Sequence, residues 1–312
     1  MWMRSKVLLF AAAASLLVWT ACAINSKPKE SPTSGKLSLY VSDSHAALAA
    51  KEADLFCSLY NDAHITLYSA STRECLVHLI NDSVRMVLTD RALNAEERRI
   101  ITQEKLKIDS LQVAVDALAL LVNRVNDLQA LSMAELTGII DQRLTTWQQL
   151  PGSGLTGRLE LVTTGKNSGA YELLKNHFLH RIEDFVPAVM TAAQSEVVKY
   201  VAKHPQALGI ASLACLKEDS LKALSEEPDG AVRTLAFTGT DSTGALVHYK
   251  LHQANVYLKK YPLYYPLHVY FNHKSQLAAG FCAFIASAPG QKLILNSGLV
   301  PTTMPIRLVQ IR

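Results

Sequence analysis

The feature that most constrains the fold is a repeated unit of short apolar strand, polar turn and amphipathic helix. In the first unit Leu37, Leu39 and Val41 alternate with other residues, a polar turn follows at residues 42–44, and a helical apolar face comes next. Similar strands lie near residues 65–67, 84–88, 159–162 and 208–211. Alternating strands and helices predict the α/β class, with mainly parallel sheets flanked by helices.

The longest apolar run of the body, residues 111–122, is interrupted only by Gln112 and Asp116. Such a run predicts a strand that is buried on both faces or that crosses between two domains. A later aromatic stretch at residues 261–272 is also expected to be extended, whereas residues 215–247 show no clear pattern.

Helix starts are marked by capping boxes, in which a polar N-cap residue is followed three residues later by Glu. The pattern occurs at Ser71 with Glu74, and the same spacing recurs at residues 94–97 and 132–135. Two further helices are expected around Pro289, the last ending at Gly298.

The N-terminus has the pattern of an export signal. Arg4 and Lys6 precede an apolar run at residues 7–19, which ends before Thr20-Ala21-Cys22. Cys22 after two small residues resembles a bacterial lipobox, in which the Cys is lipidated, although Trp19 stands where Leu is common. Residues 1–22 are therefore interpreted as a lipoprotein signal peptide and 23–36 as a flexible tether. The alternative is ordinary secretion with an incidental Cys22.

Length and charge limit the possible partners. The 312 residues suffice for two domains. Five Lys or Arg residues and one acidic residue precede Leu37. The remaining chain therefore carries 26 basic and 26 acidic residues and has no net charge. A neutral body gives no reason to expect a nucleic-acid partner. The five cysteines lack the close pairing of a disulfide scaffold or a CxxC zinc module.

Motifs for catalysis or metal binding are not found in the sequence. There is no GxSxG, HExxH or GxxxxGK[ST] pattern. His177 with His180 and His248 with His252 have helical spacing, but neither pair has a third ligand at a diagnostic distance. Cys57 and Cys75 lie on apolar helix faces and are interpreted as structural thiols. No enzyme activity, metal or cofactor is expected.

Small polar turns recur where strands lead into helices. The first N–H groups of a helix lack intrahelical partners and carry partial positive charge, so hydroxyls and glycine there suit a small oxyanion. The alternative is that each residue only caps its helix. Several such turns at strand carboxyl ends would converge on one cleft. The turns supply the candidate ligand residues Ser42, Ser44, Ser71, Thr72, Thr89, Asp90, Ser168 and Gly169.

Several short stretches, taken in order, resemble one family. They are residues 115–123 (VDALALLVN), 136–147 (LTGIIDQRLTTW), 204–210 (HPQALGI), 261–263 (YPL), 290–292 (GQK) and 298–301 (GLVP). From residue 37 to about 301 the chain resembles the phosphate-binding lipoproteins of bacterial ABC importers, which have the type II periplasmic-binding-protein fold. This resemblance implies one lobe from residues 37–115 and 268–312, and another from 116–267.

The resemblance also implies roles for individual residues. Thr89-Asp90 matches the family's Ser-Asp pair, in which the carboxylate accepts the proton of phosphate and repels sulfate. Ser168 and Gly169 match the family's Ser-Gly. Two positions depart from the pattern: Thr164 stands where the family usually has Arg, and Ala170 where it has Thr. Arg91 and Lys166 are then the candidate charge partners of the anion.

These observations lead to one expected function. The protein should capture inorganic phosphate between two lobes and present it to an ABC permease, as a monomer anchored at the periplasmic face of the cell envelope by its N-terminal lipid. Alternatives are another small oxyanion, which the missing Arg favours, or a non-transport lipoprotein that uses the fold for sensing or interaction. A hydrolase that uses a lone Cys or His has the least support.

Overall fold

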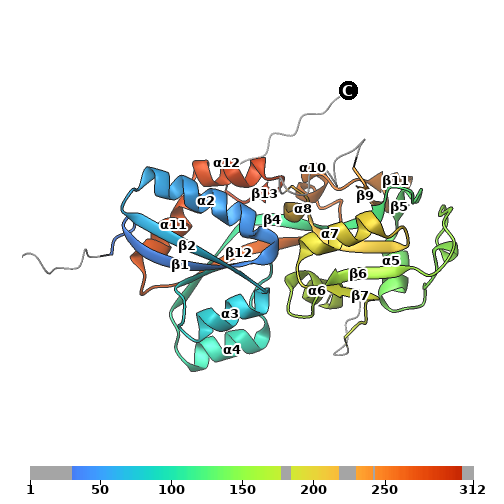
Figure 1. Cartoon of the computed structure of the whole chain (residues 1–312). Coiled ribbons are helices and arrows are strands. Elements are labelled where there is room, and N and C mark those ends of the chain that lie inside the picture. Colours follow the sequence, from blue (N-terminus) through green and yellow to red (C-terminus); the bar gives the residue numbers. More distant parts are fainter. Residues whose placement is uncertain (1–29, 177–183, 218–229, 242, 304–312) are drawn as a thin grey trace, which may run out of the picture.

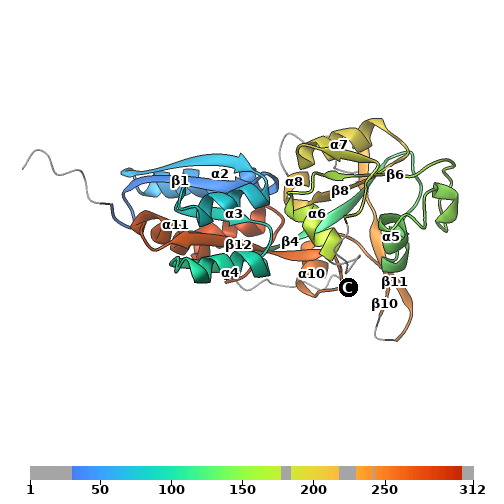
Figure 2. The same cartoon turned by 90° about the horizontal axis from the view of Figure 1, so that it is seen from below.

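The computed structural model describes residues 30–176, 184–217, 230–241 and 243–303. They form two lobes, which lie side by side in two perpendicular views (Figures 1 and 2). Strand β4 (Ile108–Asn123) crosses from the first lobe into the second, and β12 (Tyr264–Asn272) leads back into the first lobe, where it pairs with the first part of β4. The expected α/β class and two-lobed architecture are confirmed.

The sheet of the first lobe contains three parallel strands and the two crossing strands. Its order is β2 (Ala63–Ala70), β1 (Gly35–Ser42), β3 (Met86–Thr89), β12 and β4. β12 is antiparallel to both β3 and β4, and β13 (Val300–Pro301) pairs with β4. The helical elements of this lobe are η1 (Asp43–His45), α2 (Ala46–Leu59), α3 (Thr72–Ile80), α4 (Ala95–Gln103), α11 (Gln276–Ala286) and α12 (Ala288–Asn296).

The sheet continues into the second lobe through β4. Its order there is β4, β8 (Ala207–Ser212), β6 (Glu160–Thr164) and β7 (Val189–Thr191), with β9 (Val232–Thr234) also on β4. A small sheet joins β5 (Ala130–Leu131), β10 (Ala236–Thr240) and β11 (Leu246–Tyr249). The helical elements are α5 (Met133–Ile140), η2 (Trp147–Gln149), α6 (Gly169–Leu174), α7 (Gln194–Lys203), α8 (Leu213–Leu216) and α10 (Gln253–Tyr257).

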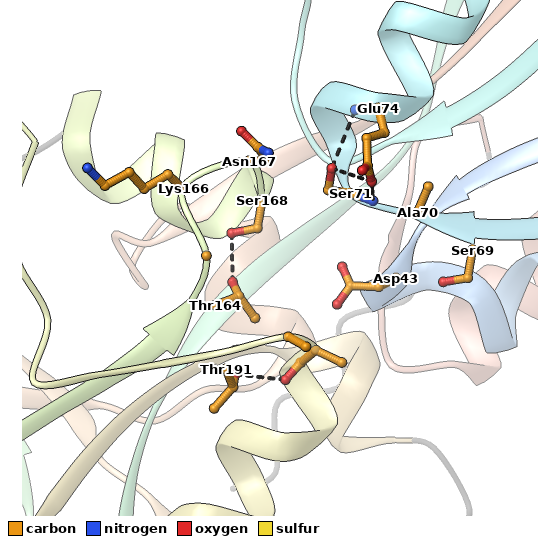
Figure 3. Close-up of a pocket in the computed structure, with 13 residues that line it drawn as sticks. Asp43, Ser69, Ala70, Ser71, Glu74, Thr164, Lys166, Asn167, Ser168 and Thr191 are labelled. Carbon is orange, nitrogen blue, oxygen red and sulfur yellow. Dashed lines mark hydrogen bonds between the residues drawn. The ribbon is translucent and has the colours of Figure 1, made fainter.

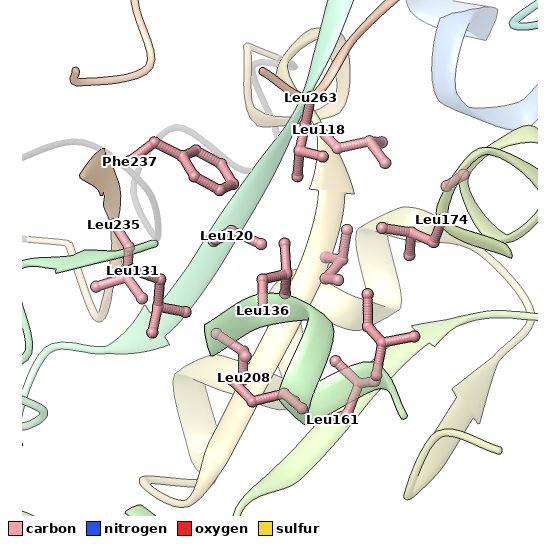
Figure 4. Packing of buried hydrophobic residues seen from close by; sticks show 14 of the residues in the cluster. Leu118, Leu120, Leu131, Leu136, Leu161, Leu174, Leu208, Leu235, Phe237 and Leu263 are labelled. Atoms are coloured by element: carbon pink, nitrogen blue, oxygen red, sulfur yellow. The ribbon is translucent and has the colours of Figure 1, made fainter. Parts of the chain in front are cut away.

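The apolar run at 111–122 forms most of β4, as the sequence predicts. Residues 108–117 of β4 pair with β12, and residues 118–122 pair with β8. Leu118 and Leu120 face one core of the second lobe, shown in Figure 4, whereas Ala119 and Leu121 face the core under α7. From Val113 onward both faces are covered, and the strand is apolar there except for Asp116 and Asn123; Asp116 is its one fully buried charged residue among those described.

The predicted capping boxes at Ser71, Asn94 and Ser132 are confirmed, because in each the N-cap side chain and the Glu side chain bond reciprocally. Two other expectations need correction. His248 lies on β11 and His252 caps α10, so the two do not share a helix face. Pro289 does not separate two helices, since it lies in the first turn of α12. His177 and His180 lie outside the described residues.

Among the described residues no single helix has the length and apolar composition needed to span a membrane; only α11 and α12 taken together, with 61° between them, meet those criteria.

Glu52 on α2 is a buried acid in the first lobe, and its two carboxylate oxygens have no hydrogen-bond partner among the described residues. Burial raises the pKa of Glu52 to about 8. The folded protein therefore takes up a proton that the unfolded chain releases above its ordinary pKa near 4.5. Stability should fall by about 1.4 kcal/mol per pH unit between these values.

Replacing Glu52 by Gln removes this titration. We expect the free energy of unfolding of E52Q, relative to wild type, to rise by about 4 kcal/mol between pH 4.5 and pH 8.5. Urea denaturation at the two pH values measures this, with the exposed Glu104→Gln as control. A difference that is the same at both pH values would contradict the assignment.

Candidate functional site

The predicted ligand residues lie at strand carboxyl ends that face one another across the two lobes. Ser42 ends β1, Thr72 follows β2 and Thr89 ends β3, while Ser168 follows β6 of the other lobe. Because β1, β2 and β3 are parallel, their carboxyl ends share one edge of the sheet.

Asp90 is the central group of this edge, and its side chain is buried. The Ser44 hydroxyl donates to Asp90 Oδ2 at 3.1 Å, and the Thr72 hydroxyl donates to Oδ1. The loops after β1 and β2 thus hold the carboxylate that follows β3. A buried carboxylate needs such donors, since an unpaired charge in the interior is costly.

Gly169 brings the second lobe against Asp90. Its N–H donates to the Thr72 hydroxyl at 3.1 Å, which in turn donates to Asp90. A Cβ atom at position 169 would lie 2.0 Å from Asp90 Oδ1, so any larger residue would force the two apart. Glycine is therefore required for this close approach.

Ser168 caps α6 and pairs with Thr164. The Ser168 hydroxyl accepts from Tyr171 N at 3.2 Å, and it lies 2.6 Å from the Thr164 hydroxyl (Figure 3). Thr164 is buried, and so is Ala170 at the other position that departs from the resembled pattern. The two hydroxyls form one polar surface where the resemblance implies a guanidinium.

The other predicted hydroxyls bond within their own loops. Ser71 shares a capping box with Glu74, drawn in Figure 3, and the Thr89 hydroxyl donates to the carbonyl of Arg91 at 3.1 Å. The Ser42 hydroxyl lies 3.2 Å from His45 Nδ1. Of the eight predicted ligand residues, the structure connects Ser44, Thr72, Asp90 and Gly169 by hydrogen bonds, and Ser168 directly precedes Gly169 in the chain.

A pocket of about 450 Å³ opens between the lobes beside this group. Figure 3 shows Asp43 and Ser69 of the first lobe facing Thr164 and Ser168 of the second. Asp43 Oδ2 accepts from Gln194 N at 3.2 Å, across the boundary, and burial raises the pKa of Asp43. The pocket is lined by Asp43, Ser69, Ala70, Ser71, Glu74, residues 164–168 and residues 191–193.

The two candidate cations are both bound to carboxylates. Arg91 donates twice to Glu97 of its own lobe, and its Nε lies 2.5 Å from Glu172 of the other lobe. Lys166 lies 2.7 Å from Asp184 and extends away from Asp43 in Figure 3. Arg91 therefore acts as a charged bridge between the lobes rather than as a free cation for a ligand.

A fully buried His–Asp–Tyr group lies next to the first loop, and sequence reasoning missed it. His45 Nε2 lies 2.9 Å from Asp116 Oδ2, and the Tyr265 hydroxyl donates to the same oxygen at 2.8 Å. The only signal in the sequence is Asp116 itself, a charge inside an apolar run.

In the part of the chain that the structure describes, no three His, Cys, Asp or Glu side chains are grouped to hold a metal ion. Burial raises the pKa of the Cys75 thiol to about 12 and that of Cys282 to about 11, which keeps both protonated at neutral pH.

The chain is similar in sequence to known proteins. A family model described as a PBP superfamily domain matches residues 26–289. The phosphate-binding protein PstS of Pseudomonas aeruginosa is 26% identical over 291 residues, covering 88% of this chain and 85% of the relative. PstS of Bacillus subtilis is 25% identical over 308 residues, covering 95% and 94%.

Solved structures share the fold. A putative phosphate ABC transporter substrate-binding protein with bound phosphate from Clostridium perfringens has a TM-score of 0.72 at 17% identity, covering 86% of this chain and 100% of its own. An ABC-type phosphate transport receptor from Vibrio cholerae has a TM-score of 0.64 at 20% identity, with the same coverage.

The Arg91 bridge leads to a stability prediction. The side chains of Arg91, Glu97 and Glu172 are 12%, 13% and 23% exposed, so Arg91→Met leaves two poorly solvated carboxylates unpaired. We expect a loss of about 2 kcal/mol in the free energy of unfolding, measured by urea denaturation. The control Lys166→Met, in an exposed pair with Asp184, should cost far less, because solvent screens such a pair. Equal losses would contradict the role of Arg91 as a buried bridge.

Proposed function

We propose that the chain, which belongs to the periplasmic-binding-protein (PBP) superfamily, captures inorganic phosphate between its two lobes. It then presents the anion to an ABC permease in the membrane. The observation that carries the proposal is a buried carboxylate, Asp90, surrounded by hydroxyl and N–H donors from both lobes. The names of the relatives from Pseudomonas aeruginosa and Bacillus subtilis support the choice of phosphate.

The chemistry of the site favours a protonated oxyanion. The Asp90 carboxylate is an acceptor, and hydrogen phosphate carries an O–H to donate to it. Sulfate has no proton at neutral pH and would meet an uncompensated repulsion, which gives discrimination by charge. The remaining phosphate oxygens are acceptors, which suit Ser42, Ser44, Ser71, Thr72, Ser168 and the backbone N–H groups at the start of α3 and α6.

Thr164 supports an alternative ligand, another small oxyanion. Without an Arg at this position, the planar and bidentate grip on an oxyanion is missing. The hydroxyl pair of Thr164 and Ser168 would suit a smaller charge or a different small oxyanion. A sensing or interaction lipoprotein on the same fold is the other alternative. The relatives are named for binding, and we propose no catalytic activity.

Export and anchoring complete the proposal. The N-terminal pattern supports a signal peptide at residues 1–22, a lipid on Cys22 and a tether from residue 23 that holds a monomer at the envelope surface. Residues 1–29, with Cys22, lie outside the described part of the chain. Residues 30–36 are described and belong to the first lobe rather than to a tether, since β1 begins at Gly35 and Glu30 Oε1 accepts from Leu277 N at 2.8 Å. The mass of the mature protein distinguishes a lipidated Cys22 from a free thiol.

The proposal predicts a selective thermal shift. Phosphate should raise the Tm of the purified protein by an amount that follows RT ln(1 + [L]/Kd), whereas sulfate at the same concentration should not. Differential scanning fluorimetry with both anions measures this. No shift at millimolar phosphate would contradict the proposal, a shift with another oxyanion alone would favour the second ligand, and no shift with any anion would favour the sensing role.

Asp90→Asn extends the same experiment to mechanism. The amide can donate to sulfate and no longer repels it, so the ratio of the phosphate to the sulfate Kd should move toward one by about tenfold or more. The matched control is Asp109→Asn, an exposed carboxylate on β4 of the same lobe. If D90N keeps the wild-type ratio of the phosphate to the sulfate Kd, Asp90 does not accept a hydrogen bond from protonated phosphate, and the proposed mechanism is wrong.

A further inference from the structure

His45 is a fully buried histidine immediately after the first ligand loop. Its ring is held between Ser42, at the end of β1, and Asp116, on the crossing strand β4. Asp116 also accepts from Tyr265 on the other crossing strand and, through Oδ1, from Ala117 N at 2.6 Å. One ring thus connects a ligand loop to both strands that join the lobes.

The partners of the ring define its two protonation states. The Asp116 carboxylate only accepts, so His45 Nε2 carries a proton in both states. A neutral ring then has a bare Nδ1, which accepts the proton of the Ser42 hydroxyl. An imidazolium has a second N–H at Nδ1, which donates to Ser42 Oγ and leaves the Ser42 O–H free to donate elsewhere.

Acids surround the ring. Burial opposes its charged form, but the hydrogen bond that the ring donates to Asp116 and the charges of Asp116, Asp90 and Asp43 outweigh burial and raise the pKa of His45. Of the elements packed against η1, α8 has no charged residue, α2 has Lys51, Glu52 and Asp54, and α7 has Glu196, Lys199 and Lys203. The backbone N–H of Gln194 on α7 donates to Asp43. The charges that act on the ring are those of Asp116, Asp90 and Asp43, with Tyr265 bonded to Asp116 and with Lys51 and Lys217 lining a small pocket beside Ser44.

We propose that the His45 imidazolium is the buried cation of the phosphate site, offsetting the charges of Asp43 and Asp90 and turning the Ser42 hydroxyl into a donor to the anion. This inference rests on the proposed function. It explains how an anion can enter a site that presents two carboxylates while Arg91 and Lys166 are held by other acids. His45 is a positioning residue in this role, since it acts through Ser42 and through its charge.

The test compares the phosphate Kd of His45→Gln with that of wild type by calorimetry from pH 5.5 to 9.5. Gln keeps a donor for Asp116 but has no charge. The titration of phosphate is common to both proteins, so the Kd ratio isolates His45. We expect a ratio of about ten or more at pH 5.5, which falls toward one as the wild-type ring loses its proton. His248→Gln, an exposed histidine on β11, should give a ratio of one throughout.

A ratio near one at low pH, or a loss that does not vary with pH, would overturn the inference while leaving phosphate binding intact. Wild type that binds no phosphate would instead refute the proposed function, and this inference with it. Long-range ¹H–¹⁵N NMR of the wild-type imidazoles gives a readout that needs no variant. Both ring nitrogens of His45 should be protonated with phosphate bound at pH 7, and a neutral ring would overturn the inference.

Discussion

The burial of the Asp90 carboxylate is the constraint on which the arrangement of the two lobes depends. A charge in the interior needs donors, and here the loops after β1 and β2 supply them through Ser44 and Thr72. The second lobe reaches the same point because residue 169 has no side chain. The contact between the lobes is therefore part of the site, since the N–H of Gly169 bonds to the hydroxyl that holds Asp90.

Charge is balanced locally across the cleft. The bridging Arg91 joins acids of both lobes, and Lys166 joins Asp184 at the rim. An anion must then be held by neutral donors, by helix N-termini and, in our proposal, by a histidine beneath the first loop. This arrangement suits a body with no net charge, because the site does not rely on a basic surface. The long strand β4 contributes to the core of each lobe and also contains Asp116, which bonds to His45. The connection between the lobes and the proposed site therefore share one strand.

Local signals explain why much of the fold could be predicted from the sequence. The capping boxes at Ser71, Asn94 and Ser132 involve neighbouring residues, and the apolar run of β4 is continuous. Parallel strands implied that their carboxyl ends would meet. What could not be predicted depends on residues far apart in the chain: Tyr265 reaches Asp116, and Arg91 reaches Glu172. The hairpin of β10 and β11 was also missed, because its short strands carry no apolar alternation.

A crystal structure of the protein grown with phosphate tests the central claim most directly. Our account predicts a phosphate between the lobes, with one oxygen within hydrogen-bond distance of Asp90 and others within reach of Ser44, Thr72, Ser168 and Gly169 N. The Arg91–Glu172 bridge should be present in the same crystal. Phosphate bound elsewhere, or closed lobes with Asp90 out of contact with the anion, would contradict the account.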